Sequence, residues 1–263
     1  MWCVKITFLG SGGAFTDYRV NYHNNALIET AEGPVLLDCG TTACQSMREL
    51  GVRRTDLRAV LFTHLHADHA SPEQLIWERV YSVEDSGRPA FLPTELIGPA
   101  ALIEPLGRAL HPFLDEYTDA QGVYRHGGLA ALVRPRVTEE VEIGGVRFRW
   151  FRVPHVTGDG VDKAAFGLCI DDGQQRLYWS GDTTFAPAWI NRAASESATA
   201  RIFHECLFYP RFGGTVHTHW AELQTLPAEL AGRVTLMHHT QVPEGIELEP
   251  FAGAAARHQV FTF

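Results

Sequence analysis

The fold of this chain is decided by the stretch Thr63-His64-Leu65-His66-Ala67-Asp68-His69-Ala70, which directly follows the apolar residues 59 to 62. Three imidazoles and one carboxylate occur within six residues. Zinc and similar divalent ions prefer these ligands, and an ion bound by them lowers the pKa of a bound water to about 7. The stretch therefore predicts a metal site where a strand ends in a loop, and a solvated histidine-rich loop is the weaker alternative.

The composition and charge limit which classes of protein this chain can belong to. Of the 263 residues, 45% are hydrophobic and 20% are charged, as in a globular chain with a sizeable core. The net charge of -9 argues against a broad nucleic-acid surface, whereas bound cations would still attract a small anionic substrate. No apolar run reaches the ~20 residues of a membrane helix. The N-terminus lacks a signal-peptide pattern and the five cysteines are widely spaced, so we expect no membrane insertion, reduced thiols and a cytoplasmic protein.

The opening third of the chain has the pattern of a β, β, β, α, β unit. Residues 2 to 8 alternate between apolar and polar, and two further runs flank the turn Glu32-Gly33-Pro34, which predicts a strand and a hairpin. A helix over residues 41 to 51 leads to the strand at 59 to 62. Later in the chain we expect hairpins over 137 to 153 and 165 to 179, and helices over 71 to 81, 100 to 110 and 222 to 231.

The sequence His-x-His-x-Asp-His after a strand resembles the signature of the metallo-β-lactamase superfamily. Two further stretches, Leu-Gly-Ser-Gly-Gly-Ala at 9 to 14 and Leu-Leu-Asp-Cys-Gly at 36 to 40, are most similar to its ribonuclease Z and phosphodiesterase branch. The resemblance implies an α/β fold, the αββα sandwich of two mixed β-sheets flanked by helices. We expect it to form one domain over residues 1 to 263.

The resemblance also implies a metal-ligand set in which later ligands stand at the ends of strands. His155 follows Pro154, Asp182 stands in Gly-Asp-Thr as a bridging carboxylate, and His238 follows an apolar run, with His239 left as an alternative. One ion would be bound by His64, His66 and His155, a second by Asp68, His69 and His238, and Asp182 would lie between them. Zinc is expected, with manganese or iron as alternatives.

Catalytic residues follow from the same resemblance. The predicted set is Asp68, Glu205 and His217, with His217 as a general acid oriented by Glu205. His219 remains an alternative for the acid. His111 and His126 are expected at the surface, and the role of His204 stays open.

The resulting hypothesis is a metal-dependent phosphodiesterase that acts on a small diester such as a cyclic nucleotide or a short oligonucleotide. Alternatives are a hydrolase of lactones, β-lactams or thioesters, a transfer-RNA 3′ processing endonuclease, and a non-catalytic metal-binding interaction protein. The endonuclease branch usually carries a long basic arm between its third histidine and the bridging aspartate. Only 26 residues separate His155 from Asp182 here. By analogy, residues 82 to 135 would suit a homodimer interface.

Overall fold

The computed structural model describes residues 4–83, 90–158, 160–197, 200–209 and 216–263. One sheet contains β1 (Lys5–Phe8), β2 (Ala26–Ile28), β3 (Val35–Leu37), β4 (Ala59–Leu61), β5 (Thr94–Gly98), β8 (Val133–Val137) and β17 (Val260–Thr262). The other contains β9 (Glu140–Ile143), β10 (Val146–Arg152), β13 (Phe166–Asp171), β14 (Arg176–Trp179), β15 (Arg201–Glu205) and β16 (Val234–Met237). Their orders are β17-β1-β2-β3-β4-β5-β8 and β16-β15-β14-β13-β10-β9. Both sheets combine parallel and antiparallel neighbours, so both are mixed.

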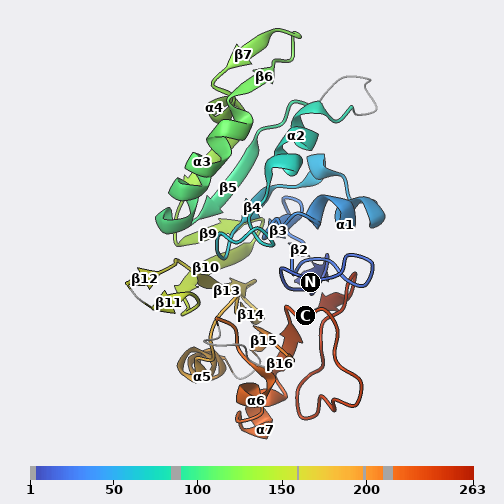
Figure 1. Cartoon of the computed structure of the whole chain (residues 1–263), viewed down its shortest axis with the longest axis vertical. Helices are drawn as coiled ribbons and strands as arrows, with labels where there is room; N and C mark the ends of the chain where they lie inside the picture. The colour runs from blue at the N-terminus through green and yellow to red at the C-terminus, as the bar shows by residue number, and fades with distance from the viewer. Residues whose placement is uncertain (1–3, 84–89, 159, 198–199, 210–215) are drawn as a thin grey trace.

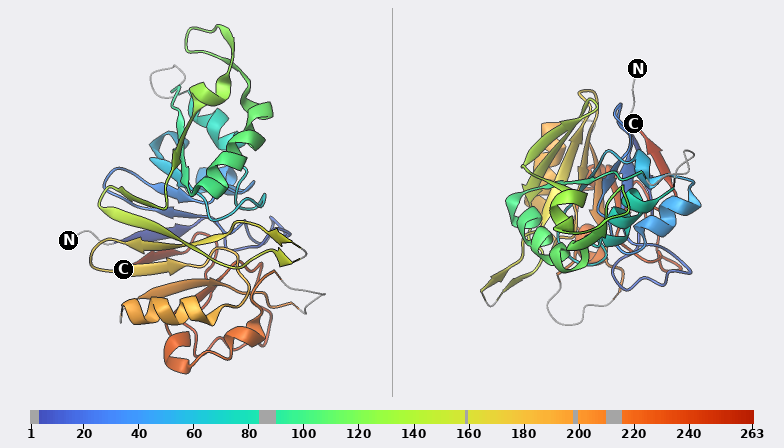
Figure 2. Two further views of the ribbon diagram at one scale, coloured as in Figure 1. Left: turned by 90° about the vertical axis from the view of Figure 1, so that its left-hand side faces the viewer. Right: turned by 90° about the horizontal axis from the view of Figure 1, so that it is seen from above.

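Helices cover the outer face of each sheet, so the chain forms four layers (Figures 1 and 2). The first sheet packs against α1 (Ala43–Glu49), α2 (Glu73–Tyr81) and α3 (Ala100–Leu114). The second packs against α5 (Pro187–Glu196), α6 (Trp220–Leu223) and α7 (Ala228–Ala231). The remaining elements are η1 (Arg54–Asp56), α4 (Gly128–Leu132) and the two hairpins β6–β7 (Glu116–Thr118, Tyr124–His126) and β11–β12 (Thr157–Gly158, Val161–Asp162). The expected αββα sandwich of two mixed sheets is confirmed.

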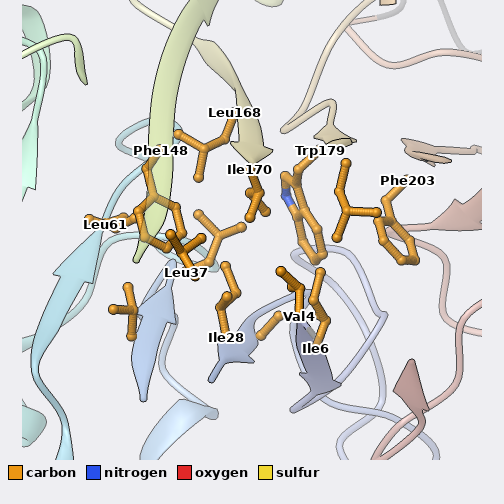
Figure 3. Packing of buried hydrophobic residues seen from close by; sticks show 14 of the residues in the cluster. Val4, Ile6, Ile28, Leu37, Leu61, Phe148, Leu168, Ile170, Trp179 and Phe203 are labelled. Atoms are coloured by element: carbon orange, nitrogen blue, oxygen red, sulfur yellow. The ribbon is translucent and has the colours of Figure 1, made fainter. Parts of the chain in front are cut away.

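The core between the sheets is built by side chains that alternate along their strands. In β10, Phe148 faces the core while its neighbours Arg147 and Arg149 are exposed, which is the two-residue period of a strand with one buried face. Phe148, Trp179 and Phe203 are almost fully buried and meet residues of the first sheet (Figure 3). Burial of this apolar surface is the main force that holds the two sheets together.

A hydrogen bond joins the two sheets close to the histidine stretch. The indole Nε1 of Trp150, in β10, donates to the carbonyl oxygen of Phe62 at 2.8 Å. Phe62 directly follows β4 and precedes the histidine stretch. The bond therefore ties the second sheet to the segment of the first sheet that delivers the histidines.

The C-terminal helix differs from its prediction. The apolar spacing predicted one helix over residues 222 to 231, but the structure has two short helices, α6 and α7, with Pro227 at the N-cap of the second. Proline has no backbone N–H to continue the helical hydrogen bonds, so the helix restarts there. The prediction of one helix was wrong.

Residues 82 to 135 contain elements that the sequence pattern did not predict, because proline interrupts their periodicity. They contribute β5, β8, the β6–β7 hairpin and α4. The predicted helix over 100 to 110 is α3, which continues to Leu114 although Pro105 and Pro112 lie inside it.

Two smaller expectations concern membranes and thiols. In the parts of the chain that the structure describes, no helix combines the length and apolar character that a bilayer span requires. The cysteines in those parts, Cys39, Cys44, Cys169 and Cys206, are buried and free. Cys3 and the start of the predicted first strand lie outside the described residues.

Candidate metal centre

The predicted ligands gather at one rim of the sandwich because each follows the carboxyl end of a strand. Four strands end there. His64 comes shortly after β4 and His155 after β10. Asp182 comes shortly after β14, and His238 directly follows β16. The two sheets thus hold side chains that are up to 174 residues apart in sequence, from His64 to His238, at a single site.

The first group of side chains consists of His64, His66, His155 and Asp182. The Nδ1 atom of His66 lies 3.1 Å from Nε2 of His64 and 3.2 Å from Nε2 of His155. The Asp182 Oδ2 atom is 3.5 Å from His64 Nε2. Three imidazole nitrogens and one carboxylate oxygen therefore converge in the arrangement that suits a divalent ion.

The second group consists of Asp68, His69, Asp182 and His238. The Nε2 atom of His69 lies 3.2 Å from both Asp68 Oδ2 and Asp182 Oδ1. The Nε2 atom of His238 lies 3.3 Å from the same two oxygens. The second group thus offers the same two types of ligand as the first, here two imidazoles and two carboxylates.

Asp182 belongs to both groups through different oxygens. Its Oδ2 atom faces the first group and its Oδ1 atom faces the second. The preceding Gly181 has φ of 60°, and a Cβ atom there would lie 2.6 Å from the carbonyl oxygen of Phe166. Glycine is therefore required for the turn that presents Asp182.

Asp38 orients one of these histidines and was not among the predicted site residues. It is fully buried, and its carboxylate accepts hydrogen bonds from His69 Nδ1 at 2.7 Å and from the backbone N–H and hydroxyl of Thr63. This leaves Nε2 of His69 directed at the second group, as second-sphere carboxylates do in metal sites. The signal in the sequence was an aspartate at the end of an apolar strand, in Leu36-Leu37-Asp38.

A carbonyl group orients a histidine of the first group in the same way. Nδ1 of His155 donates to the carbonyl oxygen of Val216 at 2.6 Å. The Nε2 lone pair of His155 then faces the group.

The electrostatics of the two groups differ. In the first, burial lowers the pKa of His64, His66 and His155, so their imidazoles are neutral and carry free lone pairs. In the second, burial is outweighed by the Asp182 carboxylate, which with its acidic neighbours raises the pKa of His238 to about 10. The acidic second group thus favours a positive charge at its centre.

Two buried polar atoms provide a test of whether a metal fits. Nε2 of His69 and Oδ1 of Asp182 are buried and make no hydrogen bond within the described residues. Buried polar atoms almost always have a hydrogen-bond partner or a metal ion, so two neighbouring buried atoms without one indicate a missing ligand. Both atoms point into the second group, and a bound cation would satisfy them.

The rings of His238 and His239 lie in different surroundings. The His238 ring enters the second group, whereas the His239 ring packs edge-on to Phe208 at 5.6 Å. His238 has φ of 59°, a left-handed backbone conformation that residues other than glycine seldom adopt. A Cβ atom on Gly13 would lie 3.2 Å from the His238 ring, so the glycine turn approaches this site closely.

A third group consists of Asp182, Glu205, His217 and His238, and it shares Asp182 and His238 with the second group. Nδ1 of His217 donates to Glu205 Oε2 at 2.7 Å and lies 3.8 Å from Asp182 Oδ2. The His217 ring is 5.2 Å from the rings of both His155 and His238. Burial opposes the charge on His217, but Glu205 outweighs it and raises the pKa of the imidazole.

His219 is engaged elsewhere. Its Nδ1 atom accepts a hydrogen bond from the backbone N–H of Ala221, which caps α6, and its Nε2 donates to the carbonyl oxygen of Tyr209. The structure therefore brings His217, and not His219, to Glu205.

Three further histidines lie outside the ligand groups. His111 and His126 are exposed on α3 and β7, as expected. His204 is fully buried, donates from Nδ1 to the carbonyl oxygen of Glu205, and stacks on Trp189 at 5.2 Å. It is part of the packing beneath α5.

A pocket of about 190 Å³ opens beside the first group. The side chains of His64, His66 and His155 form one wall, and Leu65, Leu102 and Lys163 are among the others. The first group is therefore accessible from a small cavity.

Comparison with solved structures identifies the class of this fold. The chain is similar to the metallo-β-lactamase fold protein YhfI from Bacillus subtilis, with a TM-score of 0.71, 18% identity and full coverage of both chains. It is also similar to the short form of human tRNase Z, with a TM-score of 0.66, 17% identity and 98% of each chain covered. The chain is thus an α/β protein of the metallo-β-lactamase fold, with a buried His/Asp cluster at the position predicted from its sequence.

The sequence comparison identifies the family. The family model of the Anti-Pycsar protein Apyc1 matches residues 4–261. The Anti-Pycsar protein Apyc1 of Paenibacillus sp. (strain J14) is 30% identical over 273 residues, which covers 98% of this chain and 99% of that protein. This chain belongs to the Apyc1 family.

Proposed function

We propose that this protein is a dinuclear metal-dependent phosphodiesterase that hydrolyses cyclic nucleotides. The observation that carries the proposal is the His217–Glu205 pair, 2.7 Å apart, placed against both ligand groups. A proton donor beside a metal pair is required when the leaving group is an alkoxide. Membership of the Apyc1 family supports a cyclic nucleotide as the substrate.

The proposed ligands are the side chains of the first two groups. His64, His66 and His155 would hold one divalent ion, Asp68, His69 and His238 would hold the other, and the two oxygens of Asp182 would serve both. Zinc fits this donor set, and manganese or iron remain alternatives. When bound, the ions supply Lewis acidity that activates water and neutralises the phosphate.

His217 has the role of general acid in this proposal. Its Nδ1–H is held by Glu205, so Nε2–H is the proton that it donates. Water adds to phosphorus, the bond from phosphorus to the leaving oxygen breaks, and its electron pair stays on that oxygen. The oxygen takes the proton of His217, and the proton lost by the attacking water restores the imidazolium.

Three features favour a small diester over a structured RNA. The pocket beside the first group measures about 190 Å³, below the usual range for drug-sized ligands. Between His155 and Asp182 the described residues form the short β11–β12 hairpin followed by β13 and β14, with no long arm. The net charge of -9 also disfavours a long polyanion.

Purified protein is expected to contain close to two divalent ions per chain, because two complete donor sets converge at the rim. Elemental analysis after purification without chelator measures this directly. Removal of the ions with a chelator should abolish hydrolysis, and added zinc or manganese should restore it. A metal content near zero, without uptake of either ion, would contradict the dinuclear site and favour an interaction protein.

A substrate panel tests the reaction itself. We expect metal-dependent hydrolysis of bis-(p-nitrophenyl) phosphate and of at least one cyclic nucleotide. Structured precursor transfer RNA, nitrocefin and acyl-homoserine lactones should react weakly or not at all. The described residues between His155 and Asp182 form no long arm that could bind RNA, and the general acid protonates an alkoxide leaving group. Rapid cleavage of the lactone or the β-lactam with inert diesters would instead indicate carbonyl chemistry.

A further inference from the structure

The pocket beside the first group is lined partly by residues that have no role in the proposed hydrolysis. Apart from the three histidines, it is lined by Leu65, Ala101, Leu102, Lys163 and Ala164. These residues come from the loop after β4, the first turn of α3 and the segment between β12 and β13, which lie near one another in Figure 1. An apolar cavity thus adjoins the place where a phosphate would bind.

Lys163 is the cation of this pocket, and its backbone is fixed. The N–H of Lys163 donates to the carbonyl oxygen of Val156 at 3.0 Å, and the guanidinium of Arg152 donates to the carbonyl oxygen of Lys163 at 3.2 Å. The side chain is exposed, and no carboxylate of the described residues forms an ion pair with it. The ammonium group is therefore available to a ligand at the rim of the pocket.

We propose that this pocket is the nucleobase subsite of the enzyme, with Lys163 binding the substrate phosphate at its rim. The inference rests on the proposed function and extends it by assigning residues to substrate recognition.

The chemistry of the walls favours a base over a second phosphate. Binding pockets of this kind combine apolar walls with a few convergent polar groups, which suits the faces of one planar heteroaromatic ring system. Burial of a base against Leu65, Leu102 and Ala164 removes apolar surface from water. Since Leu65, Leu102 and Ala164 offer no hydrogen-bonding side chain to the base, discrimination among bases is expected to be weak.

Ala101 allows the subsite to be filled without disturbing the core, because its side chain is exposed on the first turn of α3. The test variant is Ala101→Phe. Ala109→Phe is the matched control, since Ala109 is also exposed on α3 but does not line the pocket. Lys163→Met removes the charge and keeps much of the side chain, and Lys163→Arg retains the charge.

The measurements are calorimetric binding of a nucleoside 5′-monophosphate and of inorganic phosphate to the metal-loaded protein, together with steady-state kinetics on a cyclic nucleotide. Ala101→Phe should weaken binding of the nucleoside monophosphate roughly tenfold, as expected when the burial of about two carbon groups is lost. Binding of inorganic phosphate should not change. Ala109→Phe should behave as wild type in both measurements.

Lys163→Met should weaken binding of both ligands and raise KM more than it lowers kcat, while Lys163→Arg should bind both almost normally. Wild-type affinity of Ala101→Phe for the nucleoside monophosphate would overturn the base subsite. Unchanged phosphate binding by Lys163→Met would overturn the role of Lys163. If the wild type cleaves no cyclic nucleotide, the proposed function fails, and the binding comparison still tests the pocket separately.

Discussion

Replacement of Asp182 by alanine is expected to remove bound metal and hydrolytic activity together. Asp182 is almost fully buried, and its two oxygens face different ligand groups. Without this carboxylate, two cations a few ångströms apart would lose the negative charge that offsets their repulsion. Elemental analysis and the diesterase assay on the same preparation measure both effects.

Asp115→Ala is the control for this prediction, since Asp115 is a half-buried aspartate at the C-cap of α3, outside the ligand groups. It should retain metal and activity. Circular dichroism of Asp182→Ala should match that of the wild type, which separates loss of the site from loss of the fold. An Asp182→Ala protein that keeps two ions and full turnover would show that this carboxylate does not bridge them.

The second large effect is expected for His217→Ala, which should keep its metal but slow the hydrolysis of a cyclic nucleotide by ~10²–10⁴, the usual contribution of a general acid. His217 contributes to catalysis through its proton, because Glu205 holds its Nδ1 atom. With bis-(p-nitrophenyl) phosphate the loss should be much smaller, since p-nitrophenolate leaves without protonation. Turnover of the two substrates by the same preparation gives the comparison.

His219→Ala provides the matched control in the same segment. It removes the side-chain cap of α6, which costs about 0.5–2 kcal/mol of stability, and should leave turnover unchanged. A normal rate for His217→Ala together with a slow His219→Ala would reverse the assignment. Equal losses on both diesters by His217→Ala would point to a role other than proton donation.

Much of the fold was predictable because its determinants are local. The alternation of Phe148 with exposed arginines identifies β10 and its buried face, and Gly144-Gly145 identifies the turn before it. The β, β, β, α, β opening was confirmed for the same reason. The helix pair α6 and α7 was mispredicted because apolar spacing continues across Pro227 although the hydrogen bonds do not. β17 was missed because a three-residue edge strand carries little pattern.

The sequence by itself determined which residue types stand at the ends of which strands. The stretch from His64 to His69 follows an apolar strand, and its resemblance to the metallo-β-lactamase signature implied the fold and the later ligands His155, Asp182 and His238. Strand ends are local features, so a single sequence is sufficient to recognise them.

Tertiary structure alone decided the choices that depend on where a side chain points. The ring of His238 faces the second group from a backbone with φ of 59°. Nδ1 of His217 meets Glu205, whereas the ring of His219 caps α6. Asp38 touches His69 from 31 positions away, through a contact between parallel strand ends. Such contacts depend on how the loops after the strands are placed in space, and neighbouring residues in the sequence carry no information about that.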